Sequence, residues 1–456
     1  MHRAHITTPF MPVKKSSSSV LSSWQEKIQN RKLTVGIMGL GYVGLPLGLL
    51  FAEKGFKVIG VDPDERRTKV LNQGKSPIRH IKNERVNAAV KSGKFTATDN
   101  PKDLNKVDAV LICVPTPLTK QREPDLSYVE SSAQWVADNV STGCLVVLES
   151  TTYPGTTRDI VAPILKKAGL KVGTSVYLAY SPEREDPNNA SFSTASIPKV
   201  VGGMDATSGK LAALLYEQII SKVIPVSSAE VAEASKLLEN IFRSVNIALV
   251  NELKVVFDRM GIDIWEVVNA AKTKPFGFMP FYPGPGLGGH CIPIDPFYLT
   301  WKAREFDIAT KFIELAGEVN TNMPYFVVQK LQDALGSKGK SLRGSKILLL
   351  GLAYKKDVDD FRESPTLKLM EILERHQAKV TFNDSYIPQF PGDPHFPHLK
   401  PRKSVPLTEK TVKAADAVLI CTDHTNVDYP SLVKWSSLIV DTRNVLPPAA
   451  KNVFRA

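Results

Sequence analysis

The sequence lacks the marks of a membrane protein, a metal-binding protein and a nucleic-acid-binding protein. No apolar run approaches the ~20 residues that a membrane-spanning helix needs. The four cysteines form no CxxC or Cys/His spacing, so we predict no metal site. The net charge is +12, yet no basic run is longer than two or three residues and no basic stretch is interleaved with aromatics. The charge therefore favours small anionic ligands over nucleic acid.

Its 456 residues exceed one ordinary hydrophobic core, so two or three domains are expected. Residues 1–31 differ from the rest, because they hold a serine run (Ser16–Ser19), scattered basic residues and no apolar period. They lack the apolar centre of a secretory signal. An organellar leader and a disordered tail both stay open, and we favour the tail.

A dinucleotide-binding fingerprint follows this tail. A strand at 34–38 leads into Gly39-Leu-Gly-Tyr-Val-Gly44, then a helix over 45–54, a strand at 57–61 and Asp62. In this order the glycines permit a tight turn and a close approach of the pyrophosphate to the helix N-terminus. Asp62 would accept the ribose hydroxyls, which favours NAD over NADP, although Arg66 and Arg67 weaken that preference. The predicted cofactor site comprises Gly39, Gly41, Tyr42, Val43, Gly44, Asp62 and Arg67.

The chain then repeats itself. The stretch from Asp108 (DAVLIC) returns at Asp416, and a second strand–glycine–helix–strand–acid pattern covers 346–384. The second half lacks the glycine triplet, so we expect it to bind something other than NAD. We predict an α/β protein with two doubly wound Rossmann-like domains joined by a long central helix. The predicted division is a tail at 1–31, an NAD domain at 32–227, a central helical domain at 228–330 and a C-terminal domain at 331–456.

Three further segments carry candidate chemistry. A helix over 228–260 places Lys236, Asn240 and Arg243 on one face, which indicates a polar cleft. The glycine- and proline-rich stretch 275–296 holds Cys291, and a thiol outside an apolar element favours a nucleophile over a core cysteine. The charged run that starts at Glu183 follows a strand at 176–180, at the edge where α/β sheets bind ligands.

Together these segments resemble the UDP-glucose/GDP-mannose dehydrogenase family from about residue 32 to residue 444. No single motif is specific, but eight in family order are. They are GLGYVGLP (39–46), VPTP (114–117), ESTTYPGT (149–156), SPERE (181–185), EASKLLENIFRSVNIALVNE (233–252), GPGLGGHCIPIDP (284–296), GLAYKKDVDDFRESP (351–365) and DTRN (441–444).

The resemblance implies an NAD-dependent, four-electron oxidation of the C6 alcohol of a nucleotide sugar to a carboxylate, with two NAD per sugar. By similarity Cys291 forms a thiohemiacetal and then a thioester, which water hydrolyses. Lys236, Asn240 and Asp295 would organise the oxyanion and the water, and Glu183 would assist proton transfer. Thr116 and Thr151 would flank the NAD. The implied substrate-binding residues are Arg184, Glu185, Arg243, His290, Lys355, Arg362 and Arg443.

The family's UDP-glucose members usually carry a lysine where this chain has Ile294. The SPEREDP loop, Arg243 and GGHC instead resemble the branch that acts on N-acetylated UDP-hexosamines. UDP-N-acetylglucosamine is the first choice of substrate, followed by UDP-N-acetylmannosamine, UDP-N-acetylgalactosamine and UDP-glucose. An NAD-dependent epimerase and a non-catalytic dinucleotide-binding regulator remain as alternatives of other classes. We expect a cytoplasmic homodimer or higher homo-oligomer built on the central helix.

Overall fold

The computed structural model describes residues 16–78, 81–119, 121–184, 194–289, 291–447 and 450–456. The chain divides into two compact units. The N-terminal unit holds the chain up to Thr116 and from Asp125 to Lys236. The C-terminal unit holds Pro117–Pro124 and Leu237–Ala456. No helix in the described ranges combines the length and the apolarity that crossing a membrane requires.

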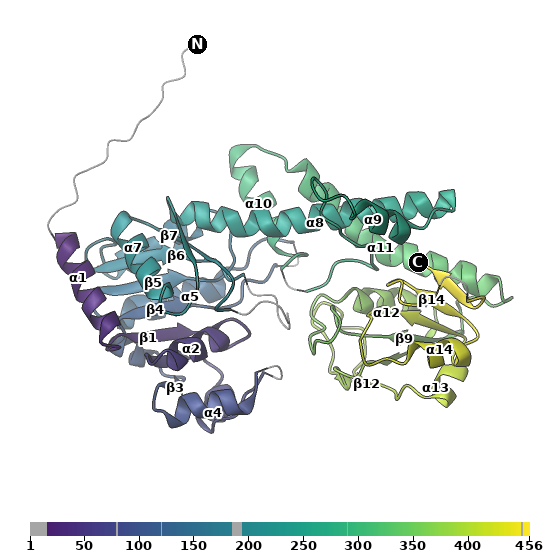
Figure 1. Cartoon of the computed structure of the whole chain (residues 1–456), viewed down its shortest axis with the longest axis horizontal. Coiled ribbons are helices and arrows are strands. Elements are labelled where there is room, and N and C mark those ends of the chain that lie inside the picture. The colour runs from purple at the N-terminus through teal and green to yellow at the C-terminus, as the bar shows by residue number, and fades with distance from the viewer. Residues whose placement is uncertain (1–15, 79–80, 120, 185–193, 290, 448–449) are drawn as a thin grey trace, which may run out of the picture. The chain divides into compact units, whose positions relative to one another are not determined.

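An eight-stranded sheet forms the centre of the N-terminal unit (Figure 1). Its order is β3-β2-β1-β4-β5-β6-β7-β8, and neighbours are parallel except β6 with β7. The first six strands follow the doubly wound order of a dinucleotide-binding fold, which confirms the predicted fold class. The strands are β1 (Thr34–Met38), β2 (Lys57–Val61), β3 (Phe95–Thr98), β4 (Ala109–Ile112), β5 (Cys144–Leu148), β6 (Val176–Tyr180), β7 (Lys199–Gly203) and β8 (Val223–Val226).

Helices cover both faces of this sheet, because its central strands are apolar on both sides. On one face Ile37 and Val58 pack with α2, α4 and α7. On the other, Met38 and Val110 pack with α5, α6 and the start of α8. The helices are α2 (Gly44–Glu53), α3 (Glu65–Asn72), α4 (Asn83–Lys91), α5 (Ser127–Asn139), α6 (Ala162–Lys167) and α7 (Ala206–Tyr216), with the short turns η1 (Pro101–Lys106) and η2 (Thr157–Val161).

The prediction of a disordered tail over 1–31 is wrong for its second half. A helix, α1 (Ser16–Gln29), packs against α7 and buries Trp24 and Ile28 in the core of the N-terminal unit. Val20 and Leu21 pack on the same cluster, so the apolar residues of α1 share one face. The serine run conceals this amphipathic spacing. Residues 1–15 lie outside the described ranges.

The long helix is confirmed as α8 (Ala229–Met260), and the unit boundary falls within it, after Lys236. The helix α9 (Ile264–Ala271) follows. An irregular stretch then runs to Ile294, as predicted from its glycine and proline content. Beyond it come α10 (Asp295–Ala303), η3 (Arg304–Phe306) and α11 (Lys311–Gly336).

A second, five-stranded parallel sheet forms the centre of the C-terminal unit (Figure 1). Its order is β10-β9-β13-β14-β15. Strands β9 (Lys346–Leu350) and β10 (Lys379–Asn383) have the predicted bounds. The other elements are α12 (Pro365–Arg375), β11 (Gln389–Phe390), β12 (Arg402–Lys403), α13 (Glu409–Lys413), β13 (Ala417–Ile420), α14 (Tyr429–Trp435), β14 (Ile439–Asp441) and β15 (Val453–Arg455).

The internal repeat extends to single side chains. Asp108 accepts a hydrogen bond from the Thr34 amide at the start of β1 (2.9 Å) and pairs with Lys27. Asp416 accepts one from the Lys346 amide at the start of β9 (2.7 Å) and pairs with Lys340. Each aspartate therefore fixes the first strand of its own sheet in the same way.

Candidate active site

The turn between β1 and α2 is shaped as the fingerprint predicts. Gly39 has φ +87°, and its amide donates to the Val61 carbonyl (2.8 Å). A Cβ on Gly44 would lie 1.9 Å from the Gly39 carbonyl oxygen, so no larger residue fits there. A Cβ on Gly41 would meet no atom within 4 Å, which leaves space beside the backbone. Val43 begins α2 without a side-chain cap, as suits a helix N-terminus that holds a phosphate.

Asp62 lies at the end of β2 and is 2% exposed. One carboxylate oxygen accepts from the Leu40 amide (2.8 Å) and from the Arg67 guanidinium (2.8 Å), and the other from the Asp64 amide (3.0 Å). The structure thus brings Asp62 and Arg67 together as an ion pair. Arg66 instead pairs with Asp64 and is almost fully exposed.

Other predicted residues gather at the carboxyl edge of the same sheet. Thr116 follows β4 and donates its hydroxyl to the Thr151 carbonyl after β5 (2.7 Å). Glu183 and Arg184 follow β6 and are half-buried, and Glu183 accepts the Arg184 amide (2.7 Å). Lys236 lies on α8 and is buried. Glu185 lies outside the described residues.

In the C-terminal unit, Cys291 begins a turn that leads into α10. The Cys291 carbonyl accepts from the Asp295 amide (2.8 Å), and the Asp295 carboxylate accepts from the side-chain amide of Asn240 on α8 (2.5 Å). Arg243 in turn donates to the Asn240 side-chain oxygen (3.1 Å). Asp295 and Asn240 are almost fully buried. The turn therefore joins a thiol, a carboxylate, an amide and a guanidinium, while His290 lies outside the described residues.

Cys291 differs from the other three cysteines in its surroundings. It is half-buried, whereas Cys113, Cys144 and Cys421 are buried. Burial raises the pKa of all three buried thiols, and that of Cys421 to about 12. Because the thiolate is the nucleophile, these three are inert near neutral pH. They are core thiols.

The glycine-rich segment before Cys291 packs tightly on the rim of the second sheet. A Cβ on Gly288 would lie 2.7 Å from the Tyr354 Cβ, and one on Gly284 would lie 2.8 Å from the Arg443 guanidinium. Arg443 follows β14 and donates its Nε to the Cys421 carbonyl (2.7 Å), and burial lowers the pKa of this guanidinium. Lys355 is half-buried in the loop after β9. The predicted nucleotide-binding side and the thiol therefore belong to one unit.

Arg362, the remaining predicted substrate residue, is exposed and forms an ion pair with Asp360 (2.6 Å).

Sequence reasoning missed two buried polar clusters. In the C-terminal unit, His424 accepts the Asp357 amide at Nδ1 (2.9 Å) and donates from Nε2 to the Asp384 carboxylate (3.1 Å). In the N-terminal unit, Lys199 pairs with Glu149 (2.7 Å). Asp384 ends the second strand–glycine–helix–strand–acid pattern of the sequence, and that position was the one available signal for the first cluster.

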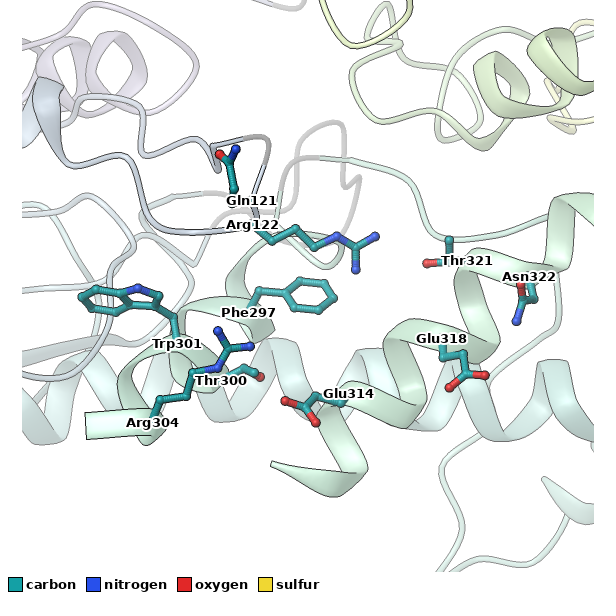
Figure 2. Close-up of a pocket in the computed structure, with 10 residues that line it drawn as sticks. All are labelled: Gln121, Arg122, Phe297, Thr300, Trp301, Arg304, Glu314, Glu318, Thr321 and Asn322. Carbon is teal, nitrogen blue, oxygen red and sulfur yellow. The ribbon is translucent and has the colours of Figure 1, made fainter. Parts of the chain in front are cut away.

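A pocket of about 440 Å³ also lies in the C-terminal unit, between α10, α11 and the segment 117–124 (Figure 2). The Arg122 guanidinium stands over the Phe297 ring, 4.7 Å from its centre. Arg304, Glu314 and Glu318 line its exposed side. None of the predicted site residues that the structure describes lines this pocket.

Comparison with known proteins gives a consistent result along the whole chain. The sequence matches three domain profiles of the UDP-glucose/GDP-mannose dehydrogenase family. These are the NAD binding domain at residues 33–220, the central domain at 230–322 and the UDP binding domain at 348–448.

Relatives match over nearly the full length. The chain is 34% identical to UDP-N-acetyl-D-mannosamine dehydrogenase of Pyrococcus horikoshii, over 93% of this chain and 98% of that protein. It is 35% identical to UDP-N-acetyl-D-glucosamine 6-dehydrogenase of Pseudomonas aeruginosa, over 78% and 84%. The solved structure of the UDP-D-ManNAc dehydrogenase from Pyrococcus horikoshii matches with a TM-score of 0.84 at 33% identity, covering 93% of this chain and 98% of that one.

The comparisons thus agree with the geometry. Three domain profiles match in order, the fold is shared with a solved relative, and the NAD binding domain keeps its glycine turn. The chain belongs to the UDP-glucose/GDP-mannose dehydrogenase family of oxidoreductases, and its cofactor is NAD.

Proposed function

We propose that this protein oxidises the C6 hydroxyl of a UDP-N-acetylhexosamine to the carboxylate, and that the hexosamine is UDP-N-acetylglucosamine. The observation that carries the proposal is the turn at the start of α10. There a half-buried thiol, Cys291, precedes a buried carboxylate, Asp295, that is held by Asn240. An enzyme that only removed or returned a hydride would need no nucleophile at this place.

Each residue of the turn has a proposed part in the chemistry. After the first oxidation the Cys291 sulfur adds to the C6 aldehyde, which forms a carbon–sulfur bond and a thiohemiacetal. The second oxidation converts this adduct to a thioester, and a water held by Asp295 and Asn240 breaks the carbon–sulfur bond. The products are the uronic acid and the free thiol. Lys236, one helical turn before Asn240, supplies positive charge to the developing oxyanion.

NAD supplies the hydride acceptor, one molecule for each of the two oxidations. Gly39, Gly41, Tyr42, Val43 and Gly44 are proposed to hold its pyrophosphate through the N-terminus of α2. Asp62 is proposed to accept a ribose hydroxyl, with Arg67 beside it. Thr116 and Thr151 flank the cofactor at the carboxyl edge of the sheet, where doubly wound folds bind dinucleotides.

The substrate is proposed to lie on the C-terminal unit. Lys355, Arg362 and Arg443 offer three cations for the UDP diphosphate. Arg184, Glu185, Arg243 and His290 are proposed to contact the sugar. Glu183 is proposed to assist proton transfer.

UDP-N-acetylmannosamine is the second candidate, because the relative from Pyrococcus horikoshii is named for that sugar. It differs from UDP-N-acetylglucosamine only in the configuration at C2. The contact that discriminates the two sugars must therefore reach the N-acetyl group.

A panel of four UDP-sugars with NAD tests the proposal. The purified full chain is incubated with UDP-N-acetylglucosamine, UDP-N-acetylmannosamine, UDP-N-acetylgalactosamine or UDP-glucose, and NADH and product mass are measured. We expect two NADH per UDP-N-acetylglucosamine and a uronic acid. One NADH indicates a simple alcohol dehydrogenase, and interconverted sugars without NADH indicate an epimerase. Faster oxidation of another sugar overturns the substrate, and no change in any sugar overturns the enzyme.

We further propose that the protein self-associates through α8. Leu238, Phe242, Leu249, Val256 and Met260 are all exposed and recur at intervals of four or seven residues, so they form one apolar stripe. A second copy can cover such a stripe by a self-complementary contact. Leu249→Arg should lower the mass measured by light scattering to that of a monomer. Tyr128→Arg, which alters an exposed aromatic residue in the N-terminal unit, should leave the mass unchanged.

A cytoplasmic location completes the proposal. Cys113, Cys144 and Cys421 are reduced thiols, the form that a reducing compartment maintains. Cell fractionation of the full chain tests this location, and recovery in an organelle or in the medium would contradict it.

A further inference from the structure

A buried charge pair lies beneath the segment that carries Glu183. Glu149 follows β5 and Lys199 begins β7, and their side chains are 0% and 6% exposed. The Lys199 ammonium donates to the Glu149 carboxylate at 2.7 Å. The Tyr216 hydroxyl on α7 donates to the other carboxylate oxygen, and the ammonium lies 4.9 Å from the centre of the Tyr216 ring. All three residues belong to the N-terminal unit.

Stability alone does not account for this pair. Removing two charges from water costs several kcal/mol per ion, and their attraction in the interior repays that cost only in part. Apolar residues of similar volume are often as stabilising at such positions. A buried ion pair among apolar strands is therefore weak evidence for stability, and its other contacts indicate its role.

Those contacts lead to the segment after β6. The Lys199 ammonium donates to the Pro182 carbonyl at 3.3 Å. The Ser181 hydroxyl donates to the Val200 carbonyl at 2.8 Å, and the Arg184 guanidinium donates to the Pro198 carbonyl at 2.6 Å. The start of β7 thus holds residues 181–184 at three points, and only the contact from Lys199 carries a buried charge.

Lys199 also acts on Glu183 through its charge. Burial works against the ammonium, but the carboxylates of Glu149 and Glu183 outweigh it and keep the pKa of Lys199 above its ordinary value. The other titratable groups at this place are the Cys113 thiol after β4 and the Tyr216 hydroxyl, and burial raises the pKa of both. Among these groups, Lys199 is the one cation within the described residues that balances two carboxylates.

We infer that Lys199 is a positioning residue, and that with Glu149 as its counter-ion it holds the Pro182 carbonyl and thereby fixes Glu183. The inference rests on the proposed function, because Glu183 is there the group that assists proton transfer. Glu149 keeps the ammonium in place, and Tyr216 fixes the Glu149 carboxylate.

The test removes both charges together, so that no unpaired charge stays buried. The double variant Glu149→Gln/Lys199→Met should fold and should lose about 10- to 100-fold in kcat, the size of loss that misplacing a reacting group produces. The KM values for NAD and UDP-sugar should change little, because the pair contacts neither ligand. The control Glu374→Gln/Arg402→Met removes a part-buried ion pair of the C-terminal unit and should leave kcat unchanged.

A double-mutant cycle with Glu183→Gln separates positioning from general structural damage. If Lys199 acts through Glu183, removing the pair from the Glu183→Gln enzyme should cost little more. Two results would overturn the inference: losses in kcat that multiply because they are independent, or a double variant with wild-type kcat. If the double variant does not fold, Lys199→Arg, which keeps the charge and moves the donors, enters the same cycle. A wild-type protein that oxidises no UDP-sugar would instead refute the proposed function, so the two failures are distinguishable.

Discussion

Glu233 provides a quantitative test of how α8 is attached within the N-terminal unit. It is fully buried, and its carboxylate accepts from the Gly155 amide (2.6 Å), the Thr157 amide (2.9 Å) and the Thr157 hydroxyl (2.7 Å). Burial raises the pKa of Glu233 from 4.5 to about 7, against the lowering effect of these donors. Between about pH 4.5 and 7, therefore, Glu233 is protonated in the folded state and ionised in the unfolded state. The stability that this group contributes is complete below about pH 4.5 and is lost as the pH rises through about 7.

The loss has a definite size. A shift of about 2.5 pKa units corresponds to on the order of 3 kcal/mol, because one unit is 1.36 kcal/mol. Glu233→Gln is neutral at every pH, and its side-chain oxygen still accepts from Thr157. Its side-chain NH2 group, however, meets the Gly155 amide, so two hydrogen-bond donors face each other, which costs about 1 kcal/mol. The variant should therefore be slightly less stable than the wild type at pH 5 and more stable at pH 8.5.

Urea unfolding of both proteins across this pH range measures the difference. Because the chain has two units, the midpoint of the transition that reports the N-terminal unit is compared. Glu230→Gln, on the same helix but part-exposed and paired with Arg158, is the control and should show no crossing. If the wild type instead becomes more stable than Glu233→Gln as the pH rises, the three donors affect the pKa of Glu233 more than burial does, and the reasoning is refuted.

Three further predictions concern the site. Asp62→Ala frees Arg67 from its ion pair, so the preference for NAD over NADP should narrow in steady-state kinetics; a wild type that prefers NADP would show that the arginine controls the ribose site. Cys291→Ser retains a hydroxyl but lacks a good nucleophile and leaving group, so it should stall with a bound intermediate visible by mass spectrometry; wild-type turnover would mean that Cys291 is structural. Gly288→Ala places a Cβ 2.7 Å from the Tyr354 Cβ and should lower kcat about 10- to 100-fold. Gly336→Ala, whose Cβ meets nothing within 4 Å, should leave kcat unchanged. Equal kcat values for the two variants would show that the loop before Cys291 can shift without loss of activity.

The fold was predictable where local signals are strong. Strands β1, β2, β6, β9 and β10 have the expected bounds, because each is a short run rich in apolar and β-branched residues that is followed by a turn-forming glycine, aspartate or serine. Helix α1 was not predicted because its four apolar residues stand among serines, and packing against α7 supplies the surface that makes a helix favourable there. Tertiary packing, not propensity, decides such a segment.

The site was predictable only as separate pieces. Cys291 and Asp295 are close in sequence, so one turn was enough to place them together. Lys199 and Glu149 are 50 residues apart and meet because two strand ends adjoin. A lysine at the start of a strand is usually exposed, so nothing local distinguishes a buried one.

The two aspartates Asp62 and Asp384 explain how one scaffold serves two purposes. Each follows the second strand of its sheet and accepts the amide of the residue after the first strand's glycine, Leu40 at 2.8 Å and Leu352 at 2.7 Å. An ionised carboxylate offers about four acceptor positions. Asp62 uses three, one of them for a part-exposed arginine that can move.

Asp384 has no such capacity left. It accepts four backbone amides and meets His424, which is 1% exposed and is itself fixed by the Asp357 amide. Because all its acceptor positions are filled from within, Asp384 has none to offer a ribose hydroxyl, and it anchors instead the loop that carries Lys355. The second half thus keeps the strands of a dinucleotide fold, but its aspartate is occupied by four amides and a histidine. We expect cations such as Lys355 and Arg443 to hold the ligand there instead, in accord with the match to the family's UDP binding domain.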